Sequence, residues 1–147
     1  MNRREVLTVL GATAAGLTAL GAGTARADEG HEGHEQFDKC AKACADCQLH
    51  CDSCFHHCAE LVAKGKKDHV KTMHNCVDCA EVCSTAARLV SRHSALSSPA
   101  CEACAKCCDL CAESCEKFRD DKHMAACAKS CRDCATACRE MIKHLAH

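Results

Sequence analysis

The sequence of 147 residues has few of the side chains that usually build a protein core or read a nucleic acid. It contains no tryptophan, no tyrosine, three phenylalanines and one proline. Without tryptophan or tyrosine to stack on bases, and without a basic patch, the chain is not expected to bind nucleic acid. Leucine, isoleucine, valine and phenylalanine together supply only 15 of the residues from 28 to 147. This scarcity excludes a conventional core of large aliphatic side chains.

The N-terminal segment has the pattern of an export signal. Arginines at positions 3 and 4 precede a charge-free run, which ends in an Ala-Arg-Ala cleavage pattern just before Asp28. We therefore expect residues 1–27 to be a cleaved twin-arginine signal peptide and the protein to be exported to the periplasm. A general secretory signal and an uncleaved membrane anchor are the alternatives. After cleavage we expect no membrane span to remain.

Nineteen cysteines replace the missing apolar side chains, and their spacing is helical. Successive cysteines in residues 40–58 are 4, 3, 4, 3 and 4 residues apart. Because one helical turn takes 3.6 residues, alternating steps of three and four place all six cysteines on one face of a helix. One heptad frame for each of four runs puts 18 of the 19 cysteines at the core positions a or d, and Cys107 is the exception. The runs are Cys40, Cys44, Cys47, Cys51, Cys54 and Cys58; Cys76, Cys79 and Cys83; Cys101, Cys104, Cys107, Cys108, Cys111 and Cys115; and Cys127, Cys131, Cys134 and Cys138.

Short breaks separate the four runs, and polar helix-forming residues occupy the outward positions. The expected helices cover 36–63, 68–92, 99–118 and 121–145. Four helices with short links predict an all-α fold, an antiparallel up-down-up-down four-helix bundle with a cysteine-lined core. The bundle domain would span 36–147 and follow a flexible N-terminal arm at 28–35. Protonated cysteine packs as a small hydrophobe, so such a core can fold without metal.

Three chemistries compete for the cysteines. Disulfides are the default in an exported chain, but nineteen is odd, and bridges within one helix would close very short loops. Zinc and iron–sulfur clusters use discrete sets of four ligands, usually on loops, whereas a stripe along a whole helix makes no discrete set. Cu(I) is soft, prefers thiolate and accepts two or three sulfurs, which suits neighbouring cysteines on one face. We therefore predict multiple Cu(I) ions per chain, roughly 9 to 19.

The four helical cysteine stripes, their alternating C-x2-C and C-x3-C steps and the twin-arginine start resemble the bacterial copper storage proteins. The resemblance covers residues 28–147 and implies a four-helix bundle that holds many Cu(I) ions and has no catalytic activity. It also implies a homo-oligomer, often a tetramer, that keeps copper for a copper-enzyme client or a copper chaperone.

The same resemblance implies a copper entrance with histidine and methionine at the bundle end where the first helix ends. The matching residues are His57 and Met73, and Met124 is a further candidate metal ligand there. The alternative for both methionines is a gap-filling role in the core. We expect five other histidines to be surface residues and two to lie in the arm. The surface set is His50, His56, His69, His74 and His123, and the arm set is His31 and His34.

The opposite end of the bundle is expected to be closed by apolar side chains, including Phe37, Val90 and Leu145. A second apolar set falls on outward positions and is either half-buried between neighbouring helices or part of an oligomer face. It comprises Leu49, Phe55, Val62, Val77, Val82 and Leu89.

Other functions remain open at this point. The same chemistry would serve copper detoxification or delivery. A zinc-binding thiol bundle, a thiol redox protein and a purely structural bundle are further alternatives. Many core-facing thiols, with no single exposed thiol beside a base, argue against a redox enzyme.

Overall fold

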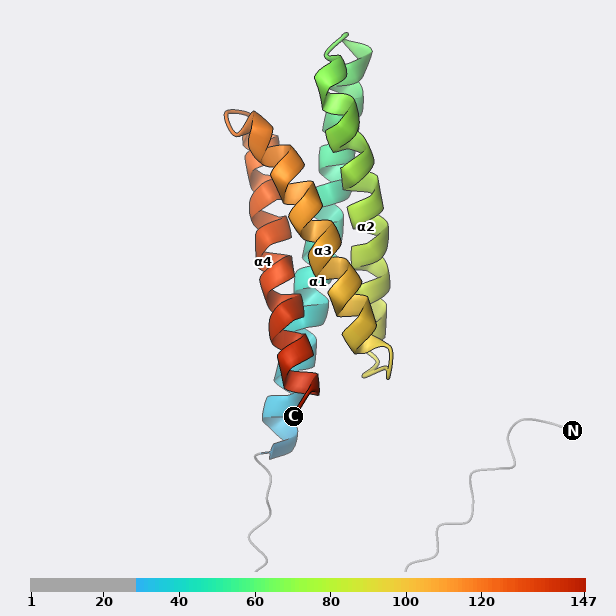
Figure 1. Cartoon of the computed structure of the whole chain (residues 1–147), viewed down its shortest axis with the longest axis vertical. Helices are drawn as coiled ribbons and strands as arrows, with labels where there is room; N and C mark the ends of the chain where they lie inside the picture. Colours follow the sequence, from blue (N-terminus) through green and yellow to red (C-terminus); the bar gives the residue numbers. More distant parts are fainter. Residues whose placement is uncertain (1–28) are drawn as a thin grey trace, which may run out of the picture.

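The computed structural model describes residues 29–147, which form an antiparallel four-helix bundle (Figure 1). The helices are α1 (Glu29–Ala63), α2 (Val70–Val90), α3 (Ser97–Cys115) and α4 (Lys122–Leu145). Each helix packs against the next, and α4 packs against α1, which closes the ring around a central axis. The all-α bundle predicted from the sequence is therefore confirmed. The predicted signal peptide, residues 1–27, lies outside the described residues.

Two short 3-10 helices mark one end of the bundle, where α1 joins α2 and α3 joins α4 (Figure 1). They are η1 (Lys67–His69) and η2 (Glu116–Phe118), and the rings of His69 and Phe118 stack at 4.0 Å between centroids. We call this the connection end. The opposite end holds the link from α2 to α3 and the C-terminus.

Three helix boundaries have a clear local cause. Gly65 has a φ of 88° and ends α1, with Lys66 N–H donating to Leu61 O at 3.0 Å. His93 takes the equivalent position after α2 at φ 51°, which is uncommon for a residue with a Cβ. Asp121 caps α4 by accepting from the N–H of His123 at 2.8 Å, a type of bond worth about 1 kcal/mol.

All four observed helix starts differ from the predicted ones: α2 begins two residues later and α4 one residue later, whereas α1 and α3 begin earlier. α1 begins at Glu29, so residues 29–35, expected to be a flexible arm, are helical. α3 begins at Ser97 rather than at Pro99, because proline is tolerated anywhere in a first turn, where its missing N–H has no intrahelical partner to lose. No helix among residues 29–147 combines the length and the apolar character that a membrane crossing requires.

Cysteine fills the core of the bundle. Eighteen of the nineteen cysteines are at most 1% exposed, and alanines together with Val90, Met124 and Met141 complete the buried set. Cys107, the residue outside the heptad frames, is half-buried. The outward apolar residues divide into two groups: Val62, Val77, Val82 and Leu89 are half-buried, whereas Leu49 and Phe55 are exposed.

Candidate metal centre

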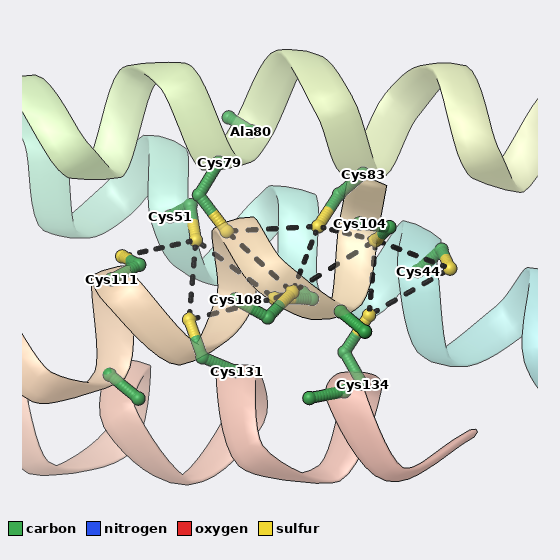
Figure 2. Close-up of a cluster of buried hydrophobic side chains, with 14 of the residues drawn as sticks. Cys44, Cys51, Cys79, Ala80, Cys83, Cys104, Cys108, Cys111, Cys131 and Cys134 are labelled. Carbon is green, nitrogen blue, oxygen red and sulfur yellow. Dashed lines mark hydrogen bonds between the residues drawn. The ribbon is translucent and has the colours of Figure 1, made fainter. Parts of the chain in front are cut away.

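The cysteine side chains of all four helices point toward one another along the bundle axis (Figure 2). Sulfur atoms on different helices lie 3.6 to 4.0 Å apart, for example 3.6 Å from Cys83 to both Cys104 and Cys108. These separations are far longer than the roughly 2.05 Å of a disulfide bond. All nineteen cysteines lie in the described part of the chain, and all are free thiols. The predicted preference for free thiols over a disulfide framework is confirmed.

The sulfurs gather in overlapping groups of four, each drawn from more than one helix. Six groups of potential metal ligands have all their ligand atoms within 4.8 Å of one another, and at least five of them are sets of four buried cysteines. Five cysteines each belong to two of these five sets: Cys47, Cys51, Cys127, Cys131 and Cys134. The sequence predicted no discrete set of four, and the sets found here overlap; they arise because facing stripes interdigitate across the axis. Since neighbouring groups share members, the sulfurs form one continuous column rather than separate sites.

Neighbouring thiols control each other's protonation. Hydrogen bonds with Cys108 and Cys111, followed by burial, raise the pKa of Cys131. Hydrogen bonds with Cys104 and Cys108, again followed by burial, raise the pKa of Cys134. A thiolate without a cation would be costly in this dry interior. At other positions, such as Cys127 and Cys138, hydrogen bonds from neighbouring thiols lower the pKa instead. Burial disfavours a bare thiolate throughout the column, so a monovalent soft cation that replaces a proton adds no charge to the core.

The predicted entrance residues lie together at the connection end. Met124 is fully buried, with its sulfur 3.5 Å from the Cys54 sulfur and 4.0 Å from the Cys58 sulfur. Met73 is half-buried and packs against the same core. His57 is also half-buried, and its Nε2 lies 2.7 Å from Asp121 Oδ2. The structure thus brings both methionines to the end of the sulfur column, while His57 is engaged by the cap of α4.

Asp121 connects this end of α1 to α4. Burial by itself would raise the pKa of Asp121, but the hydrogen bonds from His57 and from the backbone N–H of His123 and Met124 outweigh it, and the pKa is lowered. The rings of His57 and His123 stack with 4.7 Å between centroids. His123 Nε2 lies 2.9 Å from the hydroxyl oxygen of Ser53.

His69 is the histidine whose position the sequence analysis got wrong. It was expected at the surface, but it is only 6% exposed and is stacked on Phe118. The signal was in the sequence, because His69 lies seven residues before Cys76 and so occupies the same heptad position. His50, His56, His74 and His123 are exposed as predicted. His34 is exposed on α1, and the side chain of His31 lies outside the described part of the structure.

The opposite end is closed mainly by ring stacking. Phe37 is half-buried, and its ring stacks on that of His93 with 3.9 Å between centroids. The rings of His144 and Phe37 pack edge to face, with 6.0 Å between centroids. Val90 and Met141 are fully buried below it. Leu145, which we expected in this plug, is 39% exposed, so the predicted closure is correct for Phe37 and Val90 but not for Leu145.

The fold and the thiol column together define a class: a four-helix bundle that binds soft metal ions in its core. Comparison with known proteins gives the family. Residues 33–143 match the family model described as copper storage protein, and the chain belongs to that family. No relative was found among curated protein sequences.

Solved structures of copper storage proteins have the same fold. A cytosolic copper storage protein from Streptomyces lividans with five coppers is 28% identical, with 77% of this chain and 97% of that chain covered and a TM-score of 0.68. The same protein loaded with 10 copper equivalents is 30% identical over 82% of this chain and 93% of that chain, also with a TM-score of 0.68. Cu(I)-bound copper storage protein 3 from Bacillus subtilis is 33% identical over 70% of this chain and 94% of that chain, with a TM-score of 0.64.

One prediction from the sequence fails this comparison. The exported, periplasmic location inferred from the N-terminal segment is wrong, because the similar Streptomyces lividans protein is a cytosolic copper storage protein.

The neutral thiols of the metal-free column lead to a testable prediction about protons. Loading with Cu(I) should release about one proton for every Cu(I) ion bound, because each ion replaces one thiol proton in a core that stays neutral. The release can be followed by anaerobic titration in weakly buffered solution, with the same copper reagent added to buffer alone as the control. Copper uptake without acidification would show that the core already holds thiolates and would contradict the proposed neutral column.

Proposed function

We propose that this protein stores Cu(I) as a file of ions bound by the cysteine thiolates along the bundle axis. The observation that carries the proposal is the sharing of sulfurs between adjacent groups, as at Cys47 and Cys131. A shared thiolate can bridge two Cu(I) ions, so the column can hold a continuous cluster. Family membership supports the same function, since its copper-loaded members have this fold.

Charge favours Cu(I) over the other candidates. One Cu(I) neutralises one thiolate, so filling the column leaves the buried core neutral. A Zn(II) ion in a closed set of four thiolates carries two excess negative charges and needs four ligands of its own, which shared groups do not supply. A redox enzyme needs an accessible thiol beside a base, whereas eighteen of these thiols are at most 1% exposed. Storage without catalysis fits the site better than these alternatives, and the same chemistry would serve detoxification.

The direct test is anaerobic titration of the reduced full chain with Cu(I) in competition with a strong chelator. We expect stoichiometric uptake of roughly 9 to 19 ions per chain, because nineteen thiols are available as terminal or bridging ligands. Substitution C131A should lower this capacity more than C107A, since Cys131 belongs to two groups of four and Cys107 is half-buried at the edge. Uptake of only one or two ions by the unaltered chain would contradict storage.

We further propose that copper enters and leaves at the connection end. Met124 contacts the last thiols of α1, and Met73, near the start of α2, packs against the cysteine core. A thioether is a neutral soft ligand that binds Cu(I) more weakly than a thiolate, so it can pass an ion inward and later release it. His57 borders the same end, where its bond to Asp121 positions the ring.

Two buried methionines at opposite ends allow a matched test of the entrance. M124L should slow Cu(I) loading several-fold, because it removes the thioether beside Cys54 and Cys58 but keeps the side-chain volume. M141L is the control, since Met141 is equally buried at the other end. Stopped-flow loading under anaerobic conditions gives both rates. Equal slowing in both variants, or in neither, would contradict entry at the connection end.

Exposed leucines on the bundle surface favour assembly of several copies of the chain. Leu49, Leu96 and Leu110 are each more than half exposed, at 65%, 59% and 59%, and a second copy of the chain could cover them. We propose a homo-oligomer, with a tetramer as the expected form, that supplies copper to a copper enzyme or a copper chaperone. Size-exclusion chromatography with light scattering should give a mass of several chains. A single-chain mass at micromolar concentration would contradict assembly.

A further inference from the structure

The two connecting segments at the connection end carry an excess of positive charge. Residues 64–71 and 116–123 contain seven lysine and arginine side chains against four carboxylates, although the whole chain has a formal charge of −1. Both segments lie at one end of the bundle (Figure 1), and they meet where the rings of His69 and Phe118 stack. All seven cationic side chains are exposed, and we call them the basic collar. They are Lys64, Lys66, Lys67, Lys71, Lys117, Arg119 and Lys122.

The carboxylates of the two segments do little to neutralise the collar. Glu116 pairs with Arg132, and Asp121 is engaged by His57. Among the described residues, no ion pair joins a collar cation to a carboxylate. Two other aspartates are therefore left to balance seven cations. The sequence analysis found no basic patch because carboxylates are interspersed with these cations, and only the fold commits two of them to other partners.

The collar flanks the two methionines at the end of the thiol column. Lys71 precedes Met73 by two residues at the start of α2, and Lys122 precedes Met124 by two residues at the start of α4. A rim of one sign around an opening concentrates ions of the opposite sign and raises their association rate by about 10- to 1,000-fold. The collar should therefore repel a free copper cation and attract copper that is bound in an anion.

The surface suits a small anion rather than a macromolecule. Protein interfaces depend on buried aromatic or aliphatic anchors. The exposed large apolar side chains of the described chain lie outside both connecting segments. They are Leu49, Phe55, Leu96, Leu110 and Leu145. Tryptophan and tyrosine, on which nucleic-acid bases could stack, are absent from the sequence. The collar can thus attract a passing anion without holding a large partner.

We propose that the basic collar collects copper as a small anionic Cu(I) complex, of the class that thiols with additional carboxylates form. This inference rests on the proposed storage function and on entry at the connection end. Cu(I) passes from the complex to a core thiol, the proton of that thiol leaves to solvent with the displaced anionic ligand, and no electron is transferred. The exposed cations speed the encounter, whereas the thiol column supplies the affinity.

Three collar cations can be neutralised without touching the thiol column. In K66Q/K67Q/R119Q, loading from the anionic Cu(I) complex of bicinchoninate should be several-fold slower at low ionic strength, because three attracting charges are lost. The difference should vanish near roughly 1 M salt, where the Debye length falls to about 3 Å. Anaerobic stopped-flow absorbance of the complex gives the rates. Total uptake should equal that of the unaltered protein, because every core thiol is retained.

A matched variant and a second donor separate charge from structure. R88Q/R92Q/K143Q removes three exposed cations at the opposite end and should load like the unaltered protein. From the acetonitrile complex of Cu(I), which is a cation, the collar variant should load at least as fast as the unaltered protein.

Two results would overturn the proposal. One is an equal rate for the collar variant and the opposite-end variant with the anionic donor at low ionic strength. The other is equal slowing of the collar variant with both donors, because that result assigns these side chains to structure rather than to attraction. If the unaltered protein takes up only one or two ions, storage fails, and the salt dependence of that uptake still decides whether the collar attracts the anion.

Discussion

A bare thiolate is costly in the core of this bundle, and either a proton or a Cu(I) ion can neutralise it. Eighteen cysteines are at most 1% exposed, so water cannot stabilise a bare thiolate there. With protons the column packs as a small-residue core, and with Cu(I) it becomes a metal cluster of the same net charge. The fold can therefore serve both states without a change in its charge balance. This exchange of one monovalent cation for another is the physical basis of a store that fills and empties inside an intact bundle.

Sulfur spacing explains why four helices are needed. Neighbouring sulfurs of one stripe come no closer than 3.9 to 4.0 Å. The shorter contacts join different helices, as between Cys44 and Cys138 at 3.6 Å and between Cys47 and Cys131 at 3.7 Å. Antiparallel packing brings these stripes into register around one axis (Figure 2). The two ends of the bundle carry different side chains. At the end that holds the C-terminus, the rings of Phe37 and His93 stack. At the connection end lie Met124, Met73 and His69. The two ends therefore differ in chemistry although the column between them is uniform.

Heptad spacing predicted the helices, the bundle and the buried face, because a period of 3.6 is encoded directly in the positions of Cys40 to Cys58. It also predicted Cys107 as the exception, and that residue is half-buried. The groups of four could not be predicted, since they depend on how facing stripes interdigitate across the axis. His69 fell inside the predicted helix 68–92, but it was missed because its shared heptad position with Cys76 was not used to predict burial. The location inferred from the first residues failed because a signal-like pattern is independent of the fold.

Anomalous diffraction at the copper absorption edge, from crystals of the Cu(I)-loaded protein, would show directly whether the thiol column holds the copper. We predict a file of copper peaks along the bundle axis, between the sulfurs of residues such as Cys83, Cys104 and Cys108. Adjacent peaks should share thiolates that belong to two groups of four. Copper found only at surface histidines such as His50, with none between the core sulfurs, would contradict storage in the thiol column.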